Sequence, residues 1–431
     1  MKVLLVGAGA REHAIAEQVS KGAKLYSIMP KKHPGIAKLS EEFLIHDPTD
    51  ASVVAQWAKS RSIEVAFVSP DALLADGVTD TFAEVGIPVA SPTKKAARIE
   101  WDKGYARSLM QRNEIPGCPA LKICSSLEEA KDALKEIGAI VVKPLGLTGG
   151  KGVRIQGEHL NSEEEVLAYC AELLEKDGNV LLEEKLEGEE FTLQAFCDGN
   201  SLSLMPPVQD HKRAFEGDSG PNTGGMGSYS TGALLPFLEQ KDLDAAKSIM
   251  EAVLSAMRDE GSPFTGVLYG QFIATKAGIK VIEFNARFGD PEAMNVLSLL
   301  KTPLPQLFLS MSKGELVPAE FSPDCTVVKY AVPEGYPEKG KADELIMVNE
   351  QKIWDLGAKL YFGSVYQTEK GIFTSTSRTA AAVAHAQKLS EAEKAVEGAL
   401  SCISGPLWHR KDIGTQELVK RRIAHIRSLR T

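Results

Sequence analysis

Strand-like and helix-like segments alternate along the first hundred residues. Short apolar runs predict buried strands, and the segments between them carry apolar residues at helical spacing. Strands are predicted at 3–6, 25–29, 65–68 and 87–90, and helices at 11–21, 51–59 and 75–84. This alternation predicts an open, mostly parallel α/β sheet. Ligands bind such sheets at the carboxyl ends of the strands, which here are the turns at 7–12 and 69–71.

The pattern changes from about residue 102. Residues 146–152 form a glycine-rich turn, and residues 217–227 contain five glycines and are predicted to be a loop that covers something. A helix at about 242–259 leads to two further strands. Two helix–strand units are predicted on either side of the glycine-rich turn at 146–152. Helix 126–137 and strand 139–143 precede the turn, and helix 162–178 and strand 180–182 follow it.

The last hundred residues are rich in strands and form a separate α+β domain in this interpretation. The basic segment 420–430 is predicted to be a helix with a solvated basic face, and contact with an anionic partner is the alternative. Strands are predicted at 326–332, 359–367 and 372–375, and helices near 379–400 and 415–428. The predicted domains are residues 1–101, residues 102–318 with a subdomain at about 120–187, and residues 319–431.

Residues 267–285 give the clearest clue to chemistry. They read as two strands joined by a turn at 275–278, which predicts an antiparallel hairpin. With the turn centred near Ala277, Gln271 lies opposite Glu283 and shares its face of the sheet. A register slip of one residue would turn Gln271 to the other face.

Oxygen-bearing side chains share one face of the second strand. Glu283 and Asn285 alternate with Ile282 and Phe284, and Val281 falls on the polar face in this interpretation. Together with the opposite glutamine they form an oxygen-rich cluster. Hard cations such as Mg²⁺ prefer oxygen ligands and often act beside phosphates. The alternative for such a motif alone is a solvated glutamate at a strand edge.

Composition and charge narrow the class of protein. A chain of 431 residues is long enough for two to four domains. Lys and Arg number 49 against 58 Asp and Glu, so the net charge is −9. This balance excludes a general nucleic-acid binder, which needs a basic surface, but not a protein that binds small phosphorylated ligands at a local basic site.

The cysteines and the apolar segments indicate a cytoplasmic protein. The six cysteines show no C-x-x-C or metal-finger spacing, which predicts free thiols in a reducing compartment. The apolar run at the amino terminus is too short for a signal peptide. No segment approaches the roughly twenty apolar residues of a membrane span, so no membrane association is expected.

The turn at residues 7–12 begins like a dinucleotide-binding fingerprint but does not complete it. Glu12 stands where the third glycine is required, and the second strand ends Ser27-Ile-Met-Pro30, without an acidic residue to hold a ribose. A nicotinamide cofactor is therefore excluded. The remaining prediction is a Rossmann-like domain whose helix amino terminus faces a strand end and suits a phosphate.

The second glycine-rich turn is not a P-loop. Leu145 occupies the position of the first glycine, Gly152 replaces the Ser or Thr that would hold Mg²⁺, and a strand at 153–156 follows instead of a helix. A glycine-rich hairpin can still place backbone N–H groups over phosphates, with Lys143 and Lys151 adding charge. A simple hairpin turn is the alternative.

Five segments carry a resemblance to a known family. The order of a lysine-ended strand, a glycine-rich loop, an acidic segment at 183–190 and the E-F-N strand resembles the ATP-grasp superfamily. Within it, the chain resembles the glycinamide ribonucleotide synthetase (phosphoribosylamine-glycine ligase) family over nearly its whole length. The segments are GAGAREHAIA at 7–16, KPLGLTGGKGV at 143–153, QDHKR at 209–213, GPNTGGMG at 220–227 and EFNARFGDPE at 283–292.

The resemblance implies a ligase of purine biosynthesis with small-molecule substrates. Such an enzyme joins glycine to 5-phosphoribosylamine, through a glycyl phosphate, while ATP is converted to ADP and phosphate. It acts as a monomer or homodimer and uses Mg²⁺, with Mn²⁺ as an alternative ion. The implied ATP site comprises Lys103, Lys143, Gly149, Gly150 and Lys151 at the phosphates, Glu183 to Leu186 at the adenine and Glu190 at the ribose, with Gln271, Glu283 and Asn285 as metal ligands.

The resemblance also implies the substrate site. Arg287 is expected to hold the glycine carboxylate or the developing oxyanion and, with Lys143, to be catalytic; its alternative is a structural ion pair with Asp290 or Glu292. His211 is expected to position substrate and not to act as a base. The implied substrate contacts are Gly9, Arg11 and Asp71 at the ribosyl phosphate, and Asp210, Lys212, Asp290 and Arg287 around the shared substrate space. The glycine loops are expected to exclude water.

Some residues depart from the family pattern. Leu145 stands where members usually carry Asp, which removes any side-chain contact from that position. Thr374-Ser-Thr-Ser-Arg378 replaces a usual T-S-G-G-R, which weakens the case for close backbone contacts there. Three alternatives stay open: another ATP-grasp carboxylate-amine ligase, a carboxylase acting on a purine precursor or biotin, and a non-catalytic nucleotide-binding protein.

Overall fold

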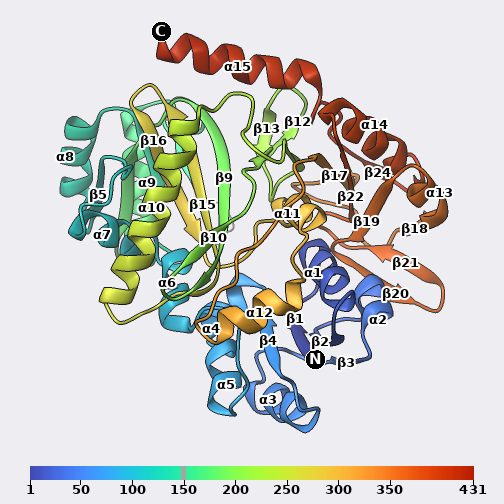
Figure 1. The fold of residues 1–431 in the computed structure, drawn as a ribbon. Coiled ribbons are helices and arrows are strands. Elements are labelled where there is room, and N and C mark those ends of the chain that lie inside the picture. Colours follow the sequence, from blue (N-terminus) through green and yellow to red (C-terminus); the bar gives the residue numbers. More distant parts are fainter. Residues whose placement is uncertain (147–151) are drawn as a thin grey trace.

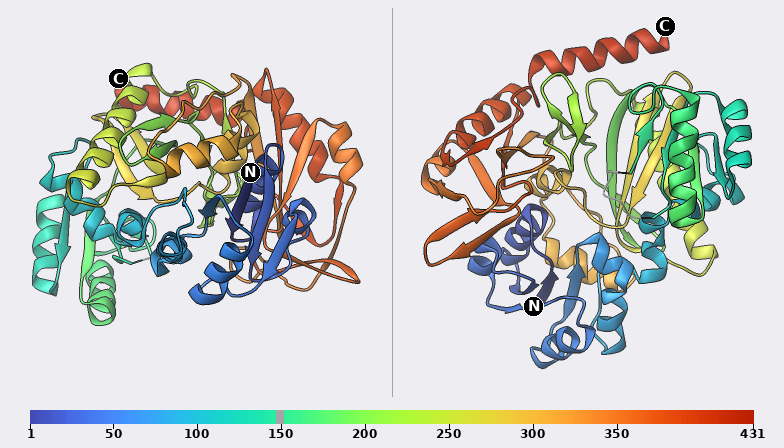
Figure 2. Two further views of the ribbon diagram at one scale, coloured as in Figure 1. Left: turned by 60° about the horizontal axis from the view of Figure 1, so that its bottom comes forward. Right: turned by 180° about the vertical axis from the view of Figure 1, so that it is seen from behind.

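The chain folds into three parts that meet near the centre of the molecule (Figure 1). The structure is a computed structural model that describes residues 1–146 and 152–431. In Figure 1 the amino-terminal part lies at the bottom, the middle part at the left and the carboxy-terminal part at the right, and Figure 2 shows the same arrangement from two other sides.

The amino-terminal part is a parallel sheet flanked by helices, which confirms the predicted α/β architecture. Its strand order is β3-β2-β1-β4, and every pairing is parallel. Its elements are β1 (Lys2–Val6), α1 (Ala10–Ser20), β2 (Lys24–Met29), α2 (Pro34–Leu39), β3 (Glu42–Ile45), α3 (Ala51–Ser60), β4 (Val65–Val68), α4 (Asp71–Asp76), α5 (Val78–Glu84) and α6 (Lys94–Trp101).

Two predictions for this part need correction. The single helix predicted at 75–84 is divided, because Gly77 adopts a left-handed φ of 88° that ends α4 and precedes α5. The strand predicted at 87–90 is reduced to one bridge between Ala66 and Val89. Both errors come from reading apolar periodicity without the glycine and turn geometry that interrupts it.

The first half of the middle part is a small sheet covered by two helices. The strand order β5-β8-β6-β7 is antiparallel, and α8 and α9 pack against it through buried residues such as Val142, Tyr169 and Leu182. Gly149, Gly150 and Lys151 lie outside the described residues. The elements are α7 (Lys103–Arg112), β5 (Leu121–Cys124), α8 (Leu127–Ile137), β6 (Ile140–Lys143), β7 (Arg154–Ile155), α9 (Glu163–Asp177) and β8 (Val180–Glu184).

The second half of the middle part contains a larger antiparallel sheet of order β10-β9-β15-β16. The glycine-containing segment 217–227, predicted as a loop, instead contains β13, which pairs with the preceding β12 to form a small hairpin. The elements are β9 (Glu189–Asp198), β10 (Leu202–Leu204), β11 (Gln209–Asp210), β12 (Arg213–Phe215), β13 (Ser219–Asn222), β14 (Gly227–Ser230), α10 (Gln240–Asp259), β15 (Thr265–Thr275), β16 (Gly278–Asn285), α11 (Glu292–Leu299) and α12 (Leu304–Ser312).

The carboxy-terminal part is built on a sheet of order β11-β14-β17-β22-β19, to which β24 adds. Two of its strands, β11 and β14, come from the middle of the sequence, and the domain boundaries stay a prediction. The elements are β17 (Cys325–Pro333), β18 (Leu345–Val348), α13 (Glu350–Asp355), β19 (Ala358–Phe362), β20 (Val365–Thr368), β21 (Gly371–Thr374), β22 (Ala380–Ala386), α14 (Leu389–Leu400), β23 (Ile403–Ser404), β24 (Leu407–Trp408) and α15 (Gln416–Arg430).

The helix predicted near 379–400 is confirmed for α14 but wrong for the alanine-rich segment before it. That segment is β22, a buried central strand between β17 and β19. Alanine has the highest helix propensity, but tertiary pairing on both edges overrides that preference. The strand predicted at 359–367 is likewise two strands, because the chain turns at Gly363, where a Cβ atom would lie 2.5 Å from the Arg378 carbonyl oxygen.

Helix α15 crosses the molecule to reach the middle part (Figure 1). Arg422 forms an ion pair with Glu189 of β9 at 3.3 Å, and Arg430 pairs with Asp242 of α10 at 2.9 Å. The predicted solvated basic face is therefore wrong for these two arginines. Within the described ranges, no helix is both long enough and apolar enough to span a membrane.

Candidate active site

A bulge in β16 places Glu283 opposite Gln271. Next to the turn, the two strands are in a register that pairs Phe272 with Val281. One extra residue on β16 after Val281 shifts this register, so that Gln271 pairs with Glu283. The predicted pair is confirmed, although the predicted face of Val281 is wrong. Val281 is fully buried in the core, because the bulge interrupts the alternation of faces before Glu283.

Arg107 of α7 holds this bulge. Its Nη2 donates to the carbonyl oxygens of Val281 at 3.1 Å and Ile282 at 2.7 Å. The same guanidinium forms an ion pair with Glu183 of β8, Nε to Oε1 at 2.5 Å. Arg107 thus joins both antiparallel sheets and fixes the register on which the polar face depends.

The amide of Gln271 is oriented by two charged neighbours. Lys212 Nζ donates to its Oε1 at 2.6 Å, and its Nε2 donates to Glu190 Oε2 at 2.6 Å. A lysine needs an acceptor and a carboxylate needs a donor, so the orientation of the amide is determined. Three residues predicted for different roles are therefore in direct contact.

Glu283 is surrounded by positive charge without a direct hydrogen bond from any described residue. Burial would raise its pKa, but Lys212, Lys143, Lys103 and Arg287 together lower the pKa of this carboxyl below its ordinary value. The carboxylate is therefore ionised at neutral pH and its oxygens are available to a ligand.

Lys143 and Glu183 form a buried ion pair at the end of the small sheet. Lys143 Nζ lies 2.6 Å from Glu183 Oε2, and Arg107 completes the site. Burial opposes ionisation of Glu183, yet the two cations lower its pKa to about 2. Both oxygens of this carboxylate are bonded to Arg107 and Lys143, so a contact between the 183–186 segment and adenine would be made by backbone atoms.

Lys103 begins α7 and faces the glycine-rich turn. Asp102 caps the helix by accepting from Tyr105 N at 2.9 Å. Lys103 Nζ donates to the Gly146 carbonyl at 2.7 Å, and its backbone N–H donates to the Leu145 carbonyl at 3.1 Å. The lysine thereby lies against the described start of the turn. Leu186 lies in the segment between β8 and β9 that connects the two sheets.

Arg287 pairs with a residue that the sequence did not indicate. Its Nη2 lies 2.8 Å from Glu100 of α6 and also donates to Asn285 Oδ1 at 3.3 Å, so the predicted alternative partners, Asp290 and Glu292, are not the ones it uses. Its Nε is buried without a hydrogen-bond partner among the described residues. Burial opposes its charge, but Glu100 and Asp71 raise the pKa of the guanidinium above its ordinary value.

The amino-terminal sheet presents its strand ends to the same place. Arg11 Nη1 donates to the Phe288 carbonyl at 3.1 Å, and Arg287 Nη1 donates to the same oxygen at 3.2 Å. Gly9 precedes α1 without any side-chain cap, so backbone N–H groups of this helix start are available to an anion. Gly9, Arg11 and Asp71 therefore lie on the Arg287 side of the site.

Asp290 and Asp210 have different surroundings. Asp290 accepts from Tyr330 at 2.5 Å and pairs with Arg378 at 3.0 Å, which leaves it tied to the carboxy-terminal part. Burial and the neighbouring Glu292 raise the pKa of Asp210 well above its ordinary value. A half-buried carboxyl beside the buried Glu292 favours a positively charged or hydrogen-bond-donating ligand.

Sequence reasoning missed Arg107 and Glu100, whose roles arise from tertiary contacts. Each lies in a helix of ordinary amphipathic pattern, and no motif marks them. A buried charged position on a helical face was the one signal that the sequence offered.

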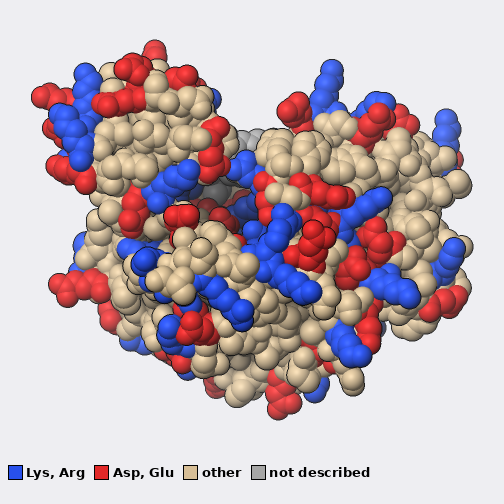
Figure 3. Space-filling model, turned by 90° about the horizontal axis from the view of Figure 1, so that it is seen from above, with Lys and Arg blue, Asp and Glu red and all other residues tan. Residues whose placement is uncertain are grey.

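One face of the molecule is hollowed. Figure 3 shows a depression between two lobes, with basic and acidic side chains along its rim. Within the part of the chain that the structure describes, no three His, Cys, Asp or Glu side chains come together as a metal site. The predicted metal set has one carboxylate and two amides, so phosphate oxygens would have to complete it.

Two antiparallel sheets that are joined through Arg107 and carry these charged side chains are the arrangement of an ATP-grasp protein. Residues 101–293 match the description "Phosphoribosylglycinamide synthetase, ATP-grasp (A) domain", and residues 1–100 and 326–416 match the N and C domains of the same enzyme. The chain belongs to the phosphoribosylglycinamide synthetase family.

Relatives of this family align over the full length of the chain. The "Phosphoribosylamine--glycine ligase" of Methanosarcina barkeri is 50% identical and that of Pyrococcus abyssi 45%, with all of this chain and 100% and 98% of those proteins covered. A Thermotoga maritima structure of the same name has a TM-score of 0.81 at 24% identity and covers 96% of this chain and all of that one.

Carboxylases share the fold. The biotin carboxylase domain of a Hydrogenobacter thermophilus 2-oxoglutarate carboxylase, in complex with MgADP and bicarbonate, has a TM-score of 0.72 at 19% identity, with 99% of this chain and 93% of that chain covered. That likeness concerns the fold alone. The 50% identity to a ligase, against 19% to the carboxylase domain, therefore places this chain with the ligases and not with the carboxylases.

Proposed function

We propose that this protein joins glycine to 5-phosphoribosylamine with conversion of ATP to ADP and phosphate, giving glycinamide ribonucleotide. Full-length identity to relatives bearing the ligase name supports the reaction. The site is supported above all by Glu283, an ionised carboxylate that accepts no hydrogen bond from the described residues while four cationic side chains lower its pKa.

The proposed ATP site spans the two antiparallel sheets. Lys103 and Lys143 hold the phosphates, Glu190 contacts the ribose and the backbone between residues 183 and 186 contacts the adenine. Gln271, Glu283 and Asn285 fit a hard cation because they offer oxygen atoms on one face of the hairpin. Mg²⁺ held there, or Mn²⁺ in its place, would offset negative charge on the phosphoryl group during transfer.

The first proposed step activates glycine. A carboxylate is a poor electrophile, so a glycine carboxylate oxygen attacks the terminal phosphorus of ATP, the bond to ADP breaks and glycyl phosphate forms. Arg287 holds the glycine carboxylate, which the positive charge that Glu100 and Asp71 maintain on its guanidinium supports. Lys143 stabilises the charge on the transferring group.

The second proposed step forms the amide. The amine of phosphoribosylamine attacks the acyl carbon, phosphate leaves and the amine loses a proton. The ribosyl phosphate lies at Gly9, Arg11 and Asp71, where the uncapped helix start supports anion binding. Asp210, Lys212 and Asp290 line the space between the two substrates. Burial and neighbouring arginines lower the pKa of His211 to about 3, which supports a positioning role and not that of a base.

Location and assembly are proposed on less specific grounds. All six cysteines are free, which supports a cytoplasmic protein. We propose a monomer or homodimer.

Release of ADP tests the reaction. The protein is incubated with ATP and Mg²⁺, with glycine and freshly prepared phosphoribosylamine added separately and together. Sustained ADP release, with matching glycinamide ribonucleotide, is expected only when both are present. Bicarbonate-dependent ADP release without glycine would instead establish a carboxylase, and no ADP release under any condition would leave a nucleotide-binding protein.

A further inference from the structure

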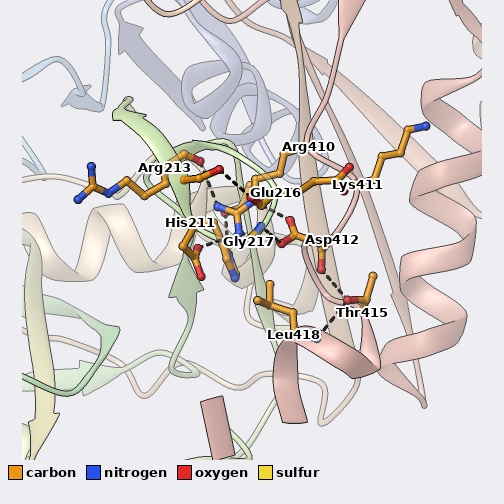
Figure 4. A network of polar contacts seen from close by, with 12 residues as sticks. His211, Arg213, Glu216, Gly217, Arg410, Lys411, Asp412, Thr415 and Leu418 are labelled. Atoms are coloured by element: carbon orange, nitrogen blue, oxygen red, sulfur yellow. Dashed lines mark hydrogen bonds and ion pairs between the residues drawn. The ribbon is translucent and has the colours of Figure 1, made fainter. Parts of the chain in front are cut away.

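The β12–β13 hairpin is held by a fully buried arginine from the carboxy-terminal part. Arg410 is 1% exposed. Its Nη2 donates to Asp218 at 2.8 Å, its Nε to Asp412 at 2.6 Å and its Nη1 to the Arg213 carbonyl at 3.0 Å. Figure 4 shows Arg410 between Asp412 and the hairpin residues Arg213, Glu216 and Gly217. The Arg410 guanidinium therefore contacts β12 and the turn that joins β12 to β13.

A second arginine completes the attachment from α15. Arg422 Nη2 donates to Asp218 Oδ2 at 2.5 Å, so each oxygen of Asp218 is bound by a different arginine. Arg422 also lies 3.3 Å from Glu189 at the start of β9. Burial raises the pKa of Asp218, but Arg422 and Arg410 outweigh this effect and lower it. The hairpin tip is thus fixed as an ionised carboxylate between two cations.

The hairpin is continuous with the proposed substrate site. Arg213, whose carbonyl Arg410 holds, directly follows Lys212, and Lys212 Nζ donates to Gln271 Oε1 at 2.6 Å. On the returning side, Thr223 N and Oγ1 both donate to the Lys212 carbonyl, at 2.7 and 2.8 Å. The backbone of Lys212 is therefore fixed from both strands.

We propose that Arg410 and Arg422 are positioning residues, which hold Lys212 against Gln271 by fixing Asp218 and the β12–β13 hairpin. The inference rests on the proposed function for its kinetic consequences. A lysine side chain rotates about four single bonds, so its ammonium group has a defined position only when those rotations are restricted. A fixed backbone limits the positions that the ammonium group can reach. The carboxy-terminal segment thereby acts on substrate through the hairpin, without contacting it.

Arg422→Gln is the test, because Arg410 is so deeply buried that its replacement endangers folding. We expect kcat/KM for glycine to fall about tenfold while KM for ATP stays within about twofold. Arg422→Lys should recover part of the loss. The matched control is Arg427→Gln, since Arg427 lies exposed on the same helix and its guanidinium bonds to no described residue.

A double-mutant cycle and amide exchange complete the experiment. Asp218→Asn and Arg422→Gln combined should lose less than the product of their separate losses, because they break the same contact. Hydrogen exchange at residues 211–213 and 223–226 should accelerate in Arg422→Gln and not in Arg427→Gln. A variant that melts earlier but retains wild-type kcat/KM and exchange would overturn the proposal.

Failure of this proposal is distinguishable from failure of the proposed function. If the wild-type protein does not use glycine and phosphoribosylamine, the function is wrong, and the exchange experiment still decides whether Arg422 fixes the hairpin. If the wild type is active and Arg422→Gln matches Arg427→Gln in both kinetics and exchange, the positioning role alone is wrong.

Discussion

Charged side chains gather around Glu283, between the two antiparallel sheets, and around Arg410, where the carboxy-terminal part meets the β12–β13 hairpin. The Arg410 cluster pairs each charge directly, since Asp218 and Asp412 each receive short bonds from arginine. Glu283 instead accepts no hydrogen bond from the described residues, although four cations influence its pKa. Both clusters join segments that are distant in sequence.

The difference separates two uses of charge. A carboxylate whose oxygens are bonded within the protein has none left for a metal and helps to hold the fold, whereas a carboxylate without such bonds among cations can bind a metal. Glu183 extends the comparison, because it lies near the site but pairs directly with Arg107 and Lys143. Residue type alone does not distinguish the role of Glu183 from that of Glu283.

Glu283→Gln should have the largest effect on activity. The amide keeps the shape but loses the negative charge that a divalent cation requires, so kcat should fall by about a thousandfold or more while some ATP binding persists. Steady-state ADP release and equilibrium ATP binding measure the two effects. Undiminished ligase activity would remove Glu283 from the metal site.

Glu183→Gln should mainly reduce stability. It leaves Arg107 and Lys143 without their buried partner, which typically costs about 3–5 kcal/mol. Urea denaturation measures the free energy of unfolding, and the loss should exceed that of Glu283→Gln. An equal or smaller loss would contradict the distinction between satisfied and unsatisfied clusters.

His211 should make stability depend on pH below its ordinary pKa of 6.5. Burial and nearby arginines lower its pKa to about 3 in the folded protein, so between these values the unfolded chain binds a proton at His211 and the folded chain does not. Stability is therefore complete above pH 6.5 and falls as the pH falls towards 3.

The histidine's contribution is isolated by comparing variants. His211→Gln should reduce the slope of unfolding free energy against pH by up to about 1.4 kcal/mol per pH unit between pH 5.5 and 4.5. His385→Gln is the control, because the His385 side chain is 49% exposed. Urea denaturation at each pH gives the slopes, and equal slopes for wild type and His211→Gln would contradict the assignment of a buried, neutral imidazole.

Glu158→Gln should have the smallest effect. Glu158 pairs with Arg213 at 2.6 Å and Lys185 at 3.3 Å, but its side chain is 36% exposed. Such a pair contributes about 1 kcal/mol or less and weakens with salt. KM for ATP should change less than about threefold. A tenfold change would show instead that this bridge between the hairpin and the small sheet positions ATP.

Much of the fold follows from local pattern, and the exceptions have physical causes. The strands β1, β2 and β4 of the parallel sheet and the two strands of the β15–β16 hairpin were predictable because short apolar runs and turn residues mark them, whereas β3 was missed. The β16 bulge was not, because it depends on Arg107, which is 174 residues away from Val281. The strand β22 was missed because its alanines favour a helix until β17 and β19 pair with it.

The candidate site divides in the same way. The Gln271–Glu283 pairing followed from strand geometry, whereas most other roles came from the resemblance and stay predictions. The partner of Arg287 could not be foreseen, since Glu100 lies 187 residues earlier on a helix without any motif. The attachment of α15 was missed because a basic helix looks alike whether solvent or acidic residues face it.

Transfer of an isotope from glycine to phosphate tests the central claim most directly. Glycine labelled with ¹⁸O in both carboxylate oxygens is supplied with ATP, Mg²⁺ and phosphoribosylamine, and the released phosphate is analysed by mass spectrometry. If ATP activates glycine as glycyl phosphate, one ¹⁸O enters each phosphate and one remains in the amide product. Unlabelled phosphate, released in amounts equal to the amide product, would contradict this account.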